Sequence, residues 1–166
     1  SAKVEWTADL AEGMERAAEE GRVVLVALGA VEEARSAAHV KDLYSNKKLS
    51  DYFTASVNIP AWSYSIGEER GLPRFSKLEP EDHVNNLIVA TERWLKPNAK
   101  GIVPLPQHLW ISPEGELLLS CAYEIDVEEF AWCFDEALRR AGVDERPEPV
   151  KGAHPPRRLL LGEVLA

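Results

Sequence analysis

The sequence predicts an α/β domain in which a central mixed β-sheet, made of a βαβ unit and a β-hairpin, is flanked by helices. Three observations lead to this prediction. The run 23–28 is apolar and rich in valine, which is typical of a strand covered on both faces. A helical segment and a second short strand follow it, so these elements form one parallel crossover. A Ser-Pro-Glu-Gly turn at 112–115 joins two further apolar segments as a hairpin.

A helix is expected before the first strand. Thr7 is a suitable N-cap for it. The helix is expected to run to about Glu20, because Gly21 stands where a left-handed C-terminal residue belongs. Its apolar side chains recur at helical spacing: Leu10, Met14, Ala17 and Ala18.

The crossover follows the first strand. Residues 32–44 favour a helix, and a short helix begins at Ser45 and reaches Phe53. The second strand is expected over 55–59, and Pro60 is expected to end it.

Residues 60–79 have no clear period and contain the aromatic side chains of Trp62, Tyr64 and Phe75. Loops of this length inside a compact domain are usually functional or disordered, and the aromatics argue against disorder. Two interpretations stay open. Trp62, Tyr64 and Phe75 either form a binding surface or pack the loop onto the body of the domain.

An amphipathic helix follows this loop and stops at Pro97. The apolar side chains that share one of its faces are Val84, Leu87, Ile88, Thr91, Trp94 and Leu95. His83 follows two acidic residues at the start of the helix and is expected to be solvated.

The hairpin is expected from strands over 105–111 and 116–122. Asp126 and Glu129 have the spacing of a capping box, which begins the last helix. That helix is expected to end at Ala141, since Gly142 is a suitable stop.

The chain therefore divides into a domain over 1–142 and a C-terminal tail over 143–166. The first part of the tail is rich in proline and charge and is expected to wrap the surface. The leucines at 159–161 and the apolar pair at 164–165 are expected to dock on the body of the domain.

The overall charge restricts the partners. The 166 residues carry a formal net charge of −9, so neither nucleic acid nor an anionic membrane surface is an expected partner. No apolar run approaches the roughly 18 residues that span a bilayer. The two cysteines are too few for a disulfide framework or a structural zinc site, and no metal or cofactor motif is present.

Two stretches of the chain carry a resemblance to a known family. In the first, a strand runs through Gly29 and Ala30 into a helix, and residues 43–46 read Leu-Tyr-Ser-Asn. This order resembles the opening of a thioredoxin-fold domain, in which the strand leads to Trp-Cys-x-x-Cys at the helix N-terminus. Laid without gaps on that motif, the chain has Glu33 and Ser36 at the two cysteine places.

The second stretch is 103–115, where a proline opens a strand of alternating apolar residues that ends in a Ser-Pro-Glu-Gly turn. It resembles the segment of the same family that carries a cis-proline, and Pro106 takes the place of that proline. A simpler interpretation is that Pro106 only sets the entry of the strand.

The resemblance spans about 4–142 and implies a thioredoxin-like fold. In pattern the chain is most similar to thioredoxin-like domains that resemble the C-terminal domain of bacterial thiol:disulfide interchange proteins. Relatives of this kind are often outside the cytoplasm, and the first residue is not methionine, which allows for a cleaved signal peptide. A bacterial, periplasmic protein is therefore favoured over a cytoplasmic one.

The chemistry of the family needs a thiolate and a second thiol that resolves the mixed disulfide. Glu33 and Ser36 cannot form a disulfide, so we expect a redox-inactive domain. Glu33 is either a helix-start residue that interacts with the helix dipole or an acid or base beside Pro106 in a binding cleft. A register shift of one or two residues would put Glu32 in its place.

In the relatives, the main chain beside the proline holds an extended peptide, which resembles strand addition and needs no cysteine. The resemblance therefore implies a non-redox binding or scaffold module for an extended peptide or partner protein, with no catalytic residue, metal or cofactor. The candidate binding residues are Glu33, Ser36, Trp62, Tyr64, Leu105 and Pro106. By strand alternation His108 shares the face of Pro106, as a ligand-binding or a plain sheet residue.

Two other functions stay open. In the first, Cys121 or Cys133 serves a thiol-dependent oxidoreductase or peroxidase, although both stand in apolar patterns that are typical of inert core cysteines. In the second, the tail over 143–166 is the contact surface of an adapter. The oligomeric state is not predicted.

Overall fold

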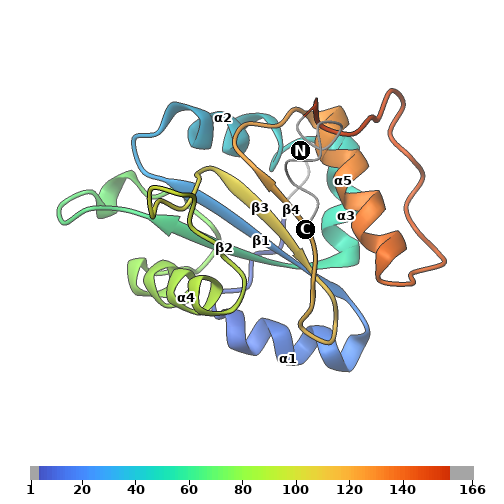
Figure 1. Ribbon diagram of the computed structural model, residues 1–166, viewed down its shortest axis with the longest axis horizontal. Coiled ribbons are helices and arrows are strands. Elements are labelled where there is room, and N and C mark those ends of the chain that lie inside the picture. The colour runs from blue at the N-terminus through green and yellow to red at the C-terminus, as the bar shows by residue number, and fades with distance from the viewer. Residues whose placement is uncertain (1–3, 158–166) are drawn as a thin grey trace.

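The computed structural model describes residues 4–157, which contain five α-helices and four strands (Figure 1). The helices are α1 (Leu10–Glu20), α2 (Ala34–Asp42), α3 (Ser50–Ala55), α4 (Pro80–Arg93) and α5 (Val127–Arg140). The strands are β1 (Val23–Ala30), β2 (Ser56–Ser63), β3 (Gln107–Ile111) and β4 (Leu117–Ala122). Short 3₁₀ turns stand at Lys47–Leu49 and Glu69–Gly71.

The four strands form one mixed sheet in the order β2-β1-β3-β4. β1 is parallel to β2 and antiparallel to β3, and β3 and β4 form the hairpin. The predicted α/β architecture with its βαβ unit and hairpin is therefore confirmed. β1 is central and buried on both faces, which explains why its sequence is continuously apolar.

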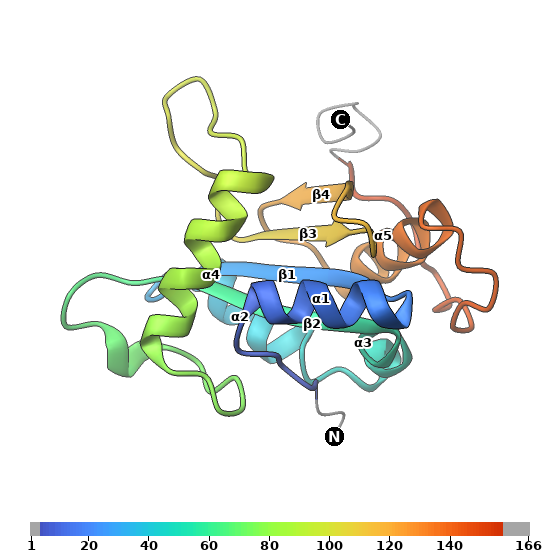
Figure 2. The same ribbon diagram turned by 90° about the horizontal axis from the view of Figure 1, so that it is seen from below.

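Helices cover both faces of the sheet (Figures 1 and 2). Val24 and Val26 of β1 face a core that contains residues of α1 and α4. The alternate residues of β1 face a larger core on the side of α2, α3 and α5, where Phe130 and Phe134 are buried. The domain thus has three layers, with the sheet in the middle.

The first helix begins two residues later than predicted. Asp9 is the N-cap of α1, and its carboxylate accepts a hydrogen bond from the Glu12 amide at 3.0 Å. Thr7 has another role, because its amide donates to the Asn58 carbonyl of β2 at 2.8 Å. Gly21 ends the helix in the left-handed conformation, with φ 67°.

The second strand does not end at Pro60, as predicted, but continues to Ser63. β2 is an edge strand, and a proline is tolerated there because its missing amide hydrogen can face the open edge. The Pro60 carbonyl points to that edge, where it accepts a hydrogen bond from Asn86 Nδ2 at 2.9 Å. Trp62 is therefore part of the sheet rather than of the following loop.

The edge of β2 is closed by side chains of α4. The Trp62 amide donates to His83 Nδ1 at 3.0 Å, beside the bond from Asn86 to Pro60. His83 is only 1% exposed, so the prediction that it is solvated is wrong. The helix turns its polar side chains inward because they satisfy main-chain groups of the strand that no other strand pairs with.

As a consequence, the apolar face of α4 seen in the sequence is not the buried one. Val84 and Ile88 are 42% and 51% exposed, whereas His83, Asn86 and Ala90 are buried. Of the apolar pattern, Trp94 and Leu95 beyond the helix are buried in the core, and Leu87 packs against it while partly exposed.

The last helix begins as predicted. The Glu129 amide donates to Asp126 Oδ1 at 2.8 Å, and the Asp126 amide donates to Glu129 Oε1 at 3.0 Å. These two bonds are the capping box. Both hairpin strands are shorter at their start than predicted, since β3 begins at Gln107 and β4 at Leu117.

Beyond α5 the chain passes over the side of the molecule (Figure 1). Val143, Val150 and Ala153 pack against the larger core, and Arg146 forms an ion pair with Asp135 at 3.2 Å. The apolar residues at 159–161 and 164–165, which were expected to dock on the body, lie outside the described residues. Among residues 4–157, no helix is both long and apolar enough to span a bilayer.

Candidate functional site

Glu33 is the N-cap of α2. Its carboxylate accepts hydrogen bonds from the amides of Arg35 at 2.9 Å and Ser36 at 3.2 Å. The same carboxylate forms an ion pair with the Arg35 guanidinium at 3.3 Å. These contacts match the interpretation of Glu33 as a helix-start residue, because an acceptor here satisfies amides that have no partner within the helix. Glu32, the alternative occupant, is exposed and has a positive φ of 64°.

Ser36 is fully buried one turn into α2. Its Oγ accepts a hydrogen bond from the Ala30 amide at 3.1 Å, which ties the start of the helix to the end of β1. Both residues at the expected cysteine places therefore act as hydrogen-bond acceptors for the main chain of the strand-to-helix turn.

The segment before β3 lies at the same end of the sheet. The Leu105–Pro106 peptide bond is cis, and Pro106 is buried. The Pro106 carbonyl accepts a hydrogen bond from the Tyr123 amide at 2.6 Å. The Arg35 guanidinium lies over the Tyr123 ring, 5.4 Å from its centre. Tyr123 thus connects the start of α2 to the Pro106 segment.

Leu105 differs from the prolines on either side of it in the hydrogen bonding of its main chain. The Pro104 carbonyl accepts from the Gln107 side chain at 3.0 Å, and the Pro106 carbonyl is bonded to Tyr123. Within residues 4–157, no group forms a hydrogen bond with the amide or the carbonyl of Leu105, and its side chain is half-buried. Leu105 therefore keeps both of its main-chain groups free of partners within the described residues.

Trp62 and Tyr64 have different environments. Trp62 is 3% exposed, and its ring packs so closely on Gly29 that a Cβ there would lie 2.5 Å from it. Its ring also lies 5.8 Å from that of Phe75, so both aromatics hold the loop on the body. Tyr64 is half-buried and borders a hollow beside α4. The binding-surface interpretation is thus left to Tyr64 and to the edge of the Trp62 ring that reaches this hollow.

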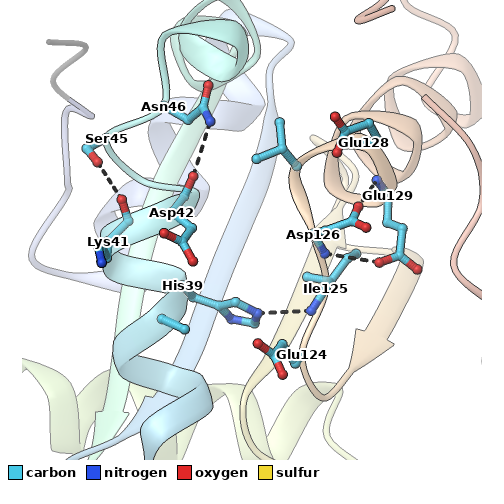
Figure 3. A pocket seen from close by; sticks show the side chains of 12 residues that line it. His39, Lys41, Asp42, Ser45, Asn46, Glu124, Ile125, Asp126, Glu128 and Glu129 are labelled. Carbon is cyan, nitrogen blue, oxygen red and sulfur yellow. Dashed lines mark hydrogen bonds between the residues drawn. The ribbon is translucent and has the colours of Figure 1, made fainter. Parts of the chain in front are cut away.

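Two buried histidines, which the sequence pattern did not single out as a pair, lie next to each other, one in the last turn of α2 and one in β3. His39 of α2 and His108 of β3 have ring centres 5.1 Å apart. The Ile125 amide donates to His39 Nε2 at 3.1 Å (Figure 3). His108 Nε2 lies 2.7 Å from the Tyr44 hydroxyl. In the described part of the chain, the Nδ1 atom of neither ring has a hydrogen-bond partner.

Burial favours the neutral form of both histidines of this pair. It lowers the pKa of His39 to about 4, against the opposite effect of Glu33 and Asp42. Burial, reinforced by the neighbouring His39, lowers the pKa of His108 well below its ordinary value. Both rings are therefore neutral at pH 7. Since His39 Nε2 accepts from a main-chain amide, its proton resides on Nδ1.

His39 also lies at the base of a hollow of about 780 Å³ between α2 and the start of α5 (Figure 3). Five carboxylates line the hollow and only one lysine, Lys41, does. The acidic residues are Asp42, Glu124, Asp126, Glu128 and Glu129. Two of them, Asp126 and Glu129, are occupied in the capping box, and no group of three metal-ligating side chains was found among residues 4–157.

The two cysteines are buried in the core, although Cys121 pairs with His108 in the sheet and so lies near this end of it. Cys121 of β4 and Cys133 of α5 are both 0% exposed, and no disulfide joins them. A buried thiol in apolar surroundings is disfavoured as a thiolate, which is the reactive form. Neither side chain is placed to meet a substrate.

Comparisons with known proteins give matches in structure only. No protein-family model and no curated protein matches the chain. A structure described as DsbH oxidoreductase is 9% identical, with a TM-score of 0.59, and the match covers 86% of this chain and 88% of that one. A proposed disulphide isomerase from Bacteroides thetaiotaomicron is 14% identical, with a TM-score of 0.51, over 87% of this chain and 97% of that one.

A thioredoxin-fold protein from Helicobacter pylori is 13% identical, with a TM-score of 0.46, over 70% of this chain and 68% of that one. At such low identities the likeness concerns the fold and not the activity. The sheet order, the crossover and the first two of these matches agree, and the chain has a thioredoxin-like fold.

Proposed function

We propose that this protein is a non-enzymatic binding module that holds an extended peptide at the end of the sheet formed by the start of α2 and the segment before β3. One observation carries the proposal. Glu33 and Ser36, at the two cysteine places, are engaged in structural hydrogen bonds, while the main chain of Leu105 keeps its donor and its acceptor available.

An extended peptide is the ligand that fits such a residue. In strand addition, a residue at an edge offers its amide and its carbonyl to the same residue of an incoming strand. The adjoining surface is mixed in chemistry, with the half-buried Leu105 side chain, the Tyr123 ring and the Arg35–Glu33 ion pair. Because Leu105 can add only about two main-chain hydrogen bonds to a ligand, we expect weak binding, with a Kd on the order of 10–1000 μM.

A thiol-based activity is the less favoured alternative. It would need Cys121 or Cys133 as a thiolate that substrate can reach, and both side chains are fully buried. The periplasmic location and the adapter role of the tail over 143–166 stay predictions.

The binding proposal is tested by NMR with the uniformly ¹⁵N-labelled protein and carboxymethylated insulin B chain as an extended, thiol-free probe. We expect shifts at the amides of Leu105 and of residues 30–33. Leu105→Ala keeps both main-chain groups and should bind, whereas Leu105→Pro lacks the amide hydrogen and should not. A titration that moves no amide at this end, or moves only amides elsewhere, contradicts the proposal.

The non-redox part of the proposal has its own assay. Reduction of insulin by dithiothreitol should proceed at the same rate with and without the protein. Catalysis above the blank would refute it, and alkylation of Cys121 or Cys133 in the folded protein at neutral pH would favour the thiol alternative instead.

A further inference from the structure

The outward face of α4 is unusual because it carries apolar side chains of the helix. A helix that covers a sheet normally buries its apolar stripe, but α4 is anchored through His83 and Asn86, which bond to the main chain of β2. Its apolar side chains, Val84 and Ile88, are left 42% and 51% exposed. Places where a local pattern contradicts the global fold are often functional.

These side chains border a groove of about 500 Å³ between α4 and the end of β2. Figures 1 and 2 show α4 on the outside of the molecule next to this strand. The residues that line the groove are Trp62, Ser63, Tyr64, Val84, Leu87, Ile88, Thr91 and Glu92. Ile88 also borders a second hollow at the start of α1, so the apolar surface continues along the helix.

The surroundings of the groove are acidic. Glu92 is the one charged residue among those that line it. Glu81 is exposed in the first turn of α4, one turn before Val84 on the same side of the helix. Burial, followed by the negative charges of Glu69 and Glu81, raises the pKa of the Tyr64 phenol, which agrees with carboxylates at this end of the groove. A second copy of this chain would bring acidic rims against each other, which disfavours self-association through this face.

The hydrogen bonds at the edge of β2 also limit which kind of partner can bind in the groove. Its outward main-chain groups at Pro60 and Trp62 are already bonded to α4, so an incoming strand would find no partners there. A helix needs no such partners, because its main-chain bonds are internal. A groove along a helix with apolar side chains at i and i+4 suits the apolar face of another helix.

We propose that this groove docks an amphipathic helix of a partner protein, with apolar side chains toward Val84 and Ile88 and lysine or arginine beside them toward Glu69, Glu81 and Glu92. This surface is distinct from the Leu105 segment, and the proposal does not depend on peptide binding there.

The test uses a synthetic amphipathic helix of leucine and lysine, about five turns long, titrated into the ¹⁵N-labelled protein. We expect shifts along α4 and at Tyr64 and a Kd that rises with salt. Ile88→Asp should weaken binding at least about 10-fold, as loss of a central apolar anchor does. Ile102→Asp, at an isoleucine that is 58% exposed in the loop before β3, is the matched control and should leave the Kd unchanged.

Three results would overturn the proposal. The first is equal affinity of the Ile88→Asp protein and the unmodified protein. The second is equal or tighter binding of a leucine and glutamate peptide of the same pattern, which would refute the role of the acidic rim. The third is a concentration-dependent dimer in sedimentation that Ile88→Asp dissociates, which would assign the face to a second copy.

Discussion

Lowering the pH from 8 to 5 should destabilise the protein because of its buried histidines. His39 and His83 are 2% and 1% exposed, and burial lowers the pKa of each to about 4. In the unfolded chain the same groups have their ordinary pKa of 6.5. Between these values the unfolded state takes up protons that the folded state does not, so the free energy of unfolding falls as the pH falls from about 6.5 to about 4.

The size of the effect follows from the two pKa values. For one histidine with these values, the linkage relation gives a loss of at most about 2 kcal/mol between pH 8 and pH 5. His39 and His83 together would remove at most about 4 kcal/mol, and His108 acts in the same direction. A typical domain has a total stability of about 5–15 kcal/mol, so the loss is large enough to measure.

The assay is urea unfolding, followed by tryptophan fluorescence at pH 8, 7, 6 and 5, for the unmodified protein and for His39→Gln. The glutamine carbonyl can accept from the Ile125 amide but does not titrate. The variant should lose less stability between pH 8 and pH 5 than the unmodified protein, by at most about 2 kcal/mol. His154→Gln, at an exposed position, is the control and should not change the pH dependence. Equal pH dependence of His39→Gln and the unmodified protein would refute the reasoning.

Three further predictions concern the start of α2 and the contacts that hold the edge of the sheet in place. Replacing Glu33 and Ser36 together by cysteine should give a disulfide and catalysis of insulin reduction, because the first thiol then stands at a helix N-terminus. A double variant that forms no disulfide and shows no catalysis would contradict the alignment of these two positions with the cysteine motif. Asn86→Leu should cost about 3 kcal/mol in urea unfolding, because three hydrogen bonds between its side chain and main-chain groups are lost, two of them buried. Asn85→Leu, at the neighbouring exposed position, should cost little. Gly29→Ala should lower the thermal midpoint by the equivalent of about 1–3 kcal/mol, because the new Cβ would lie 2.5 Å from a buried indole ring, and an unchanged midpoint would contradict this packing.

Local signals in the sequence were sufficient for most of the fold. The apolar run of β1, the stop at Gly21 and the capping box of α5 each depend on residues that are adjacent in the chain. The order of these elements permits few topologies once the crossover is right-handed. The same locality explains why Glu33 could be identified as a helix-start residue, since its partners are the next amides along the chain.

The errors arise where a long-range bond overrides a local pattern. The periodicity of α4 reveals an apolar stripe but not that Asn86 and His83 are needed at the edge of β2. The same bonds let the strand pass through Pro60, which a local rule treats as a stop. The His39–His108 pair was missed for the same reason, because 69 positions of the chain separate two rings that the fold places in contact.

The buried polar groups also connect stability to the candidate site. Ser36 bonds to the end of β1, His39 bonds to the Ile125 amide before α5, and His108 bonds to Tyr44. The first two bonds fix α2 against the end of β1 and the segment before α5, and the third joins β3 to the residues that follow α2. A site that recognises a peptide by main-chain groups needs those groups held in place. Protonation of His39 would convert its Nε2 from acceptor to donor, facing the Ile125 amide. The pKa of His39 in the folded protein is about 4, so this change takes place near pH 4, below the range in which the stability begins to fall. In the protein that is still folded there, peptide binding at Leu105 should weaken, and amide exchange at Ile125 should increase over the same pH range.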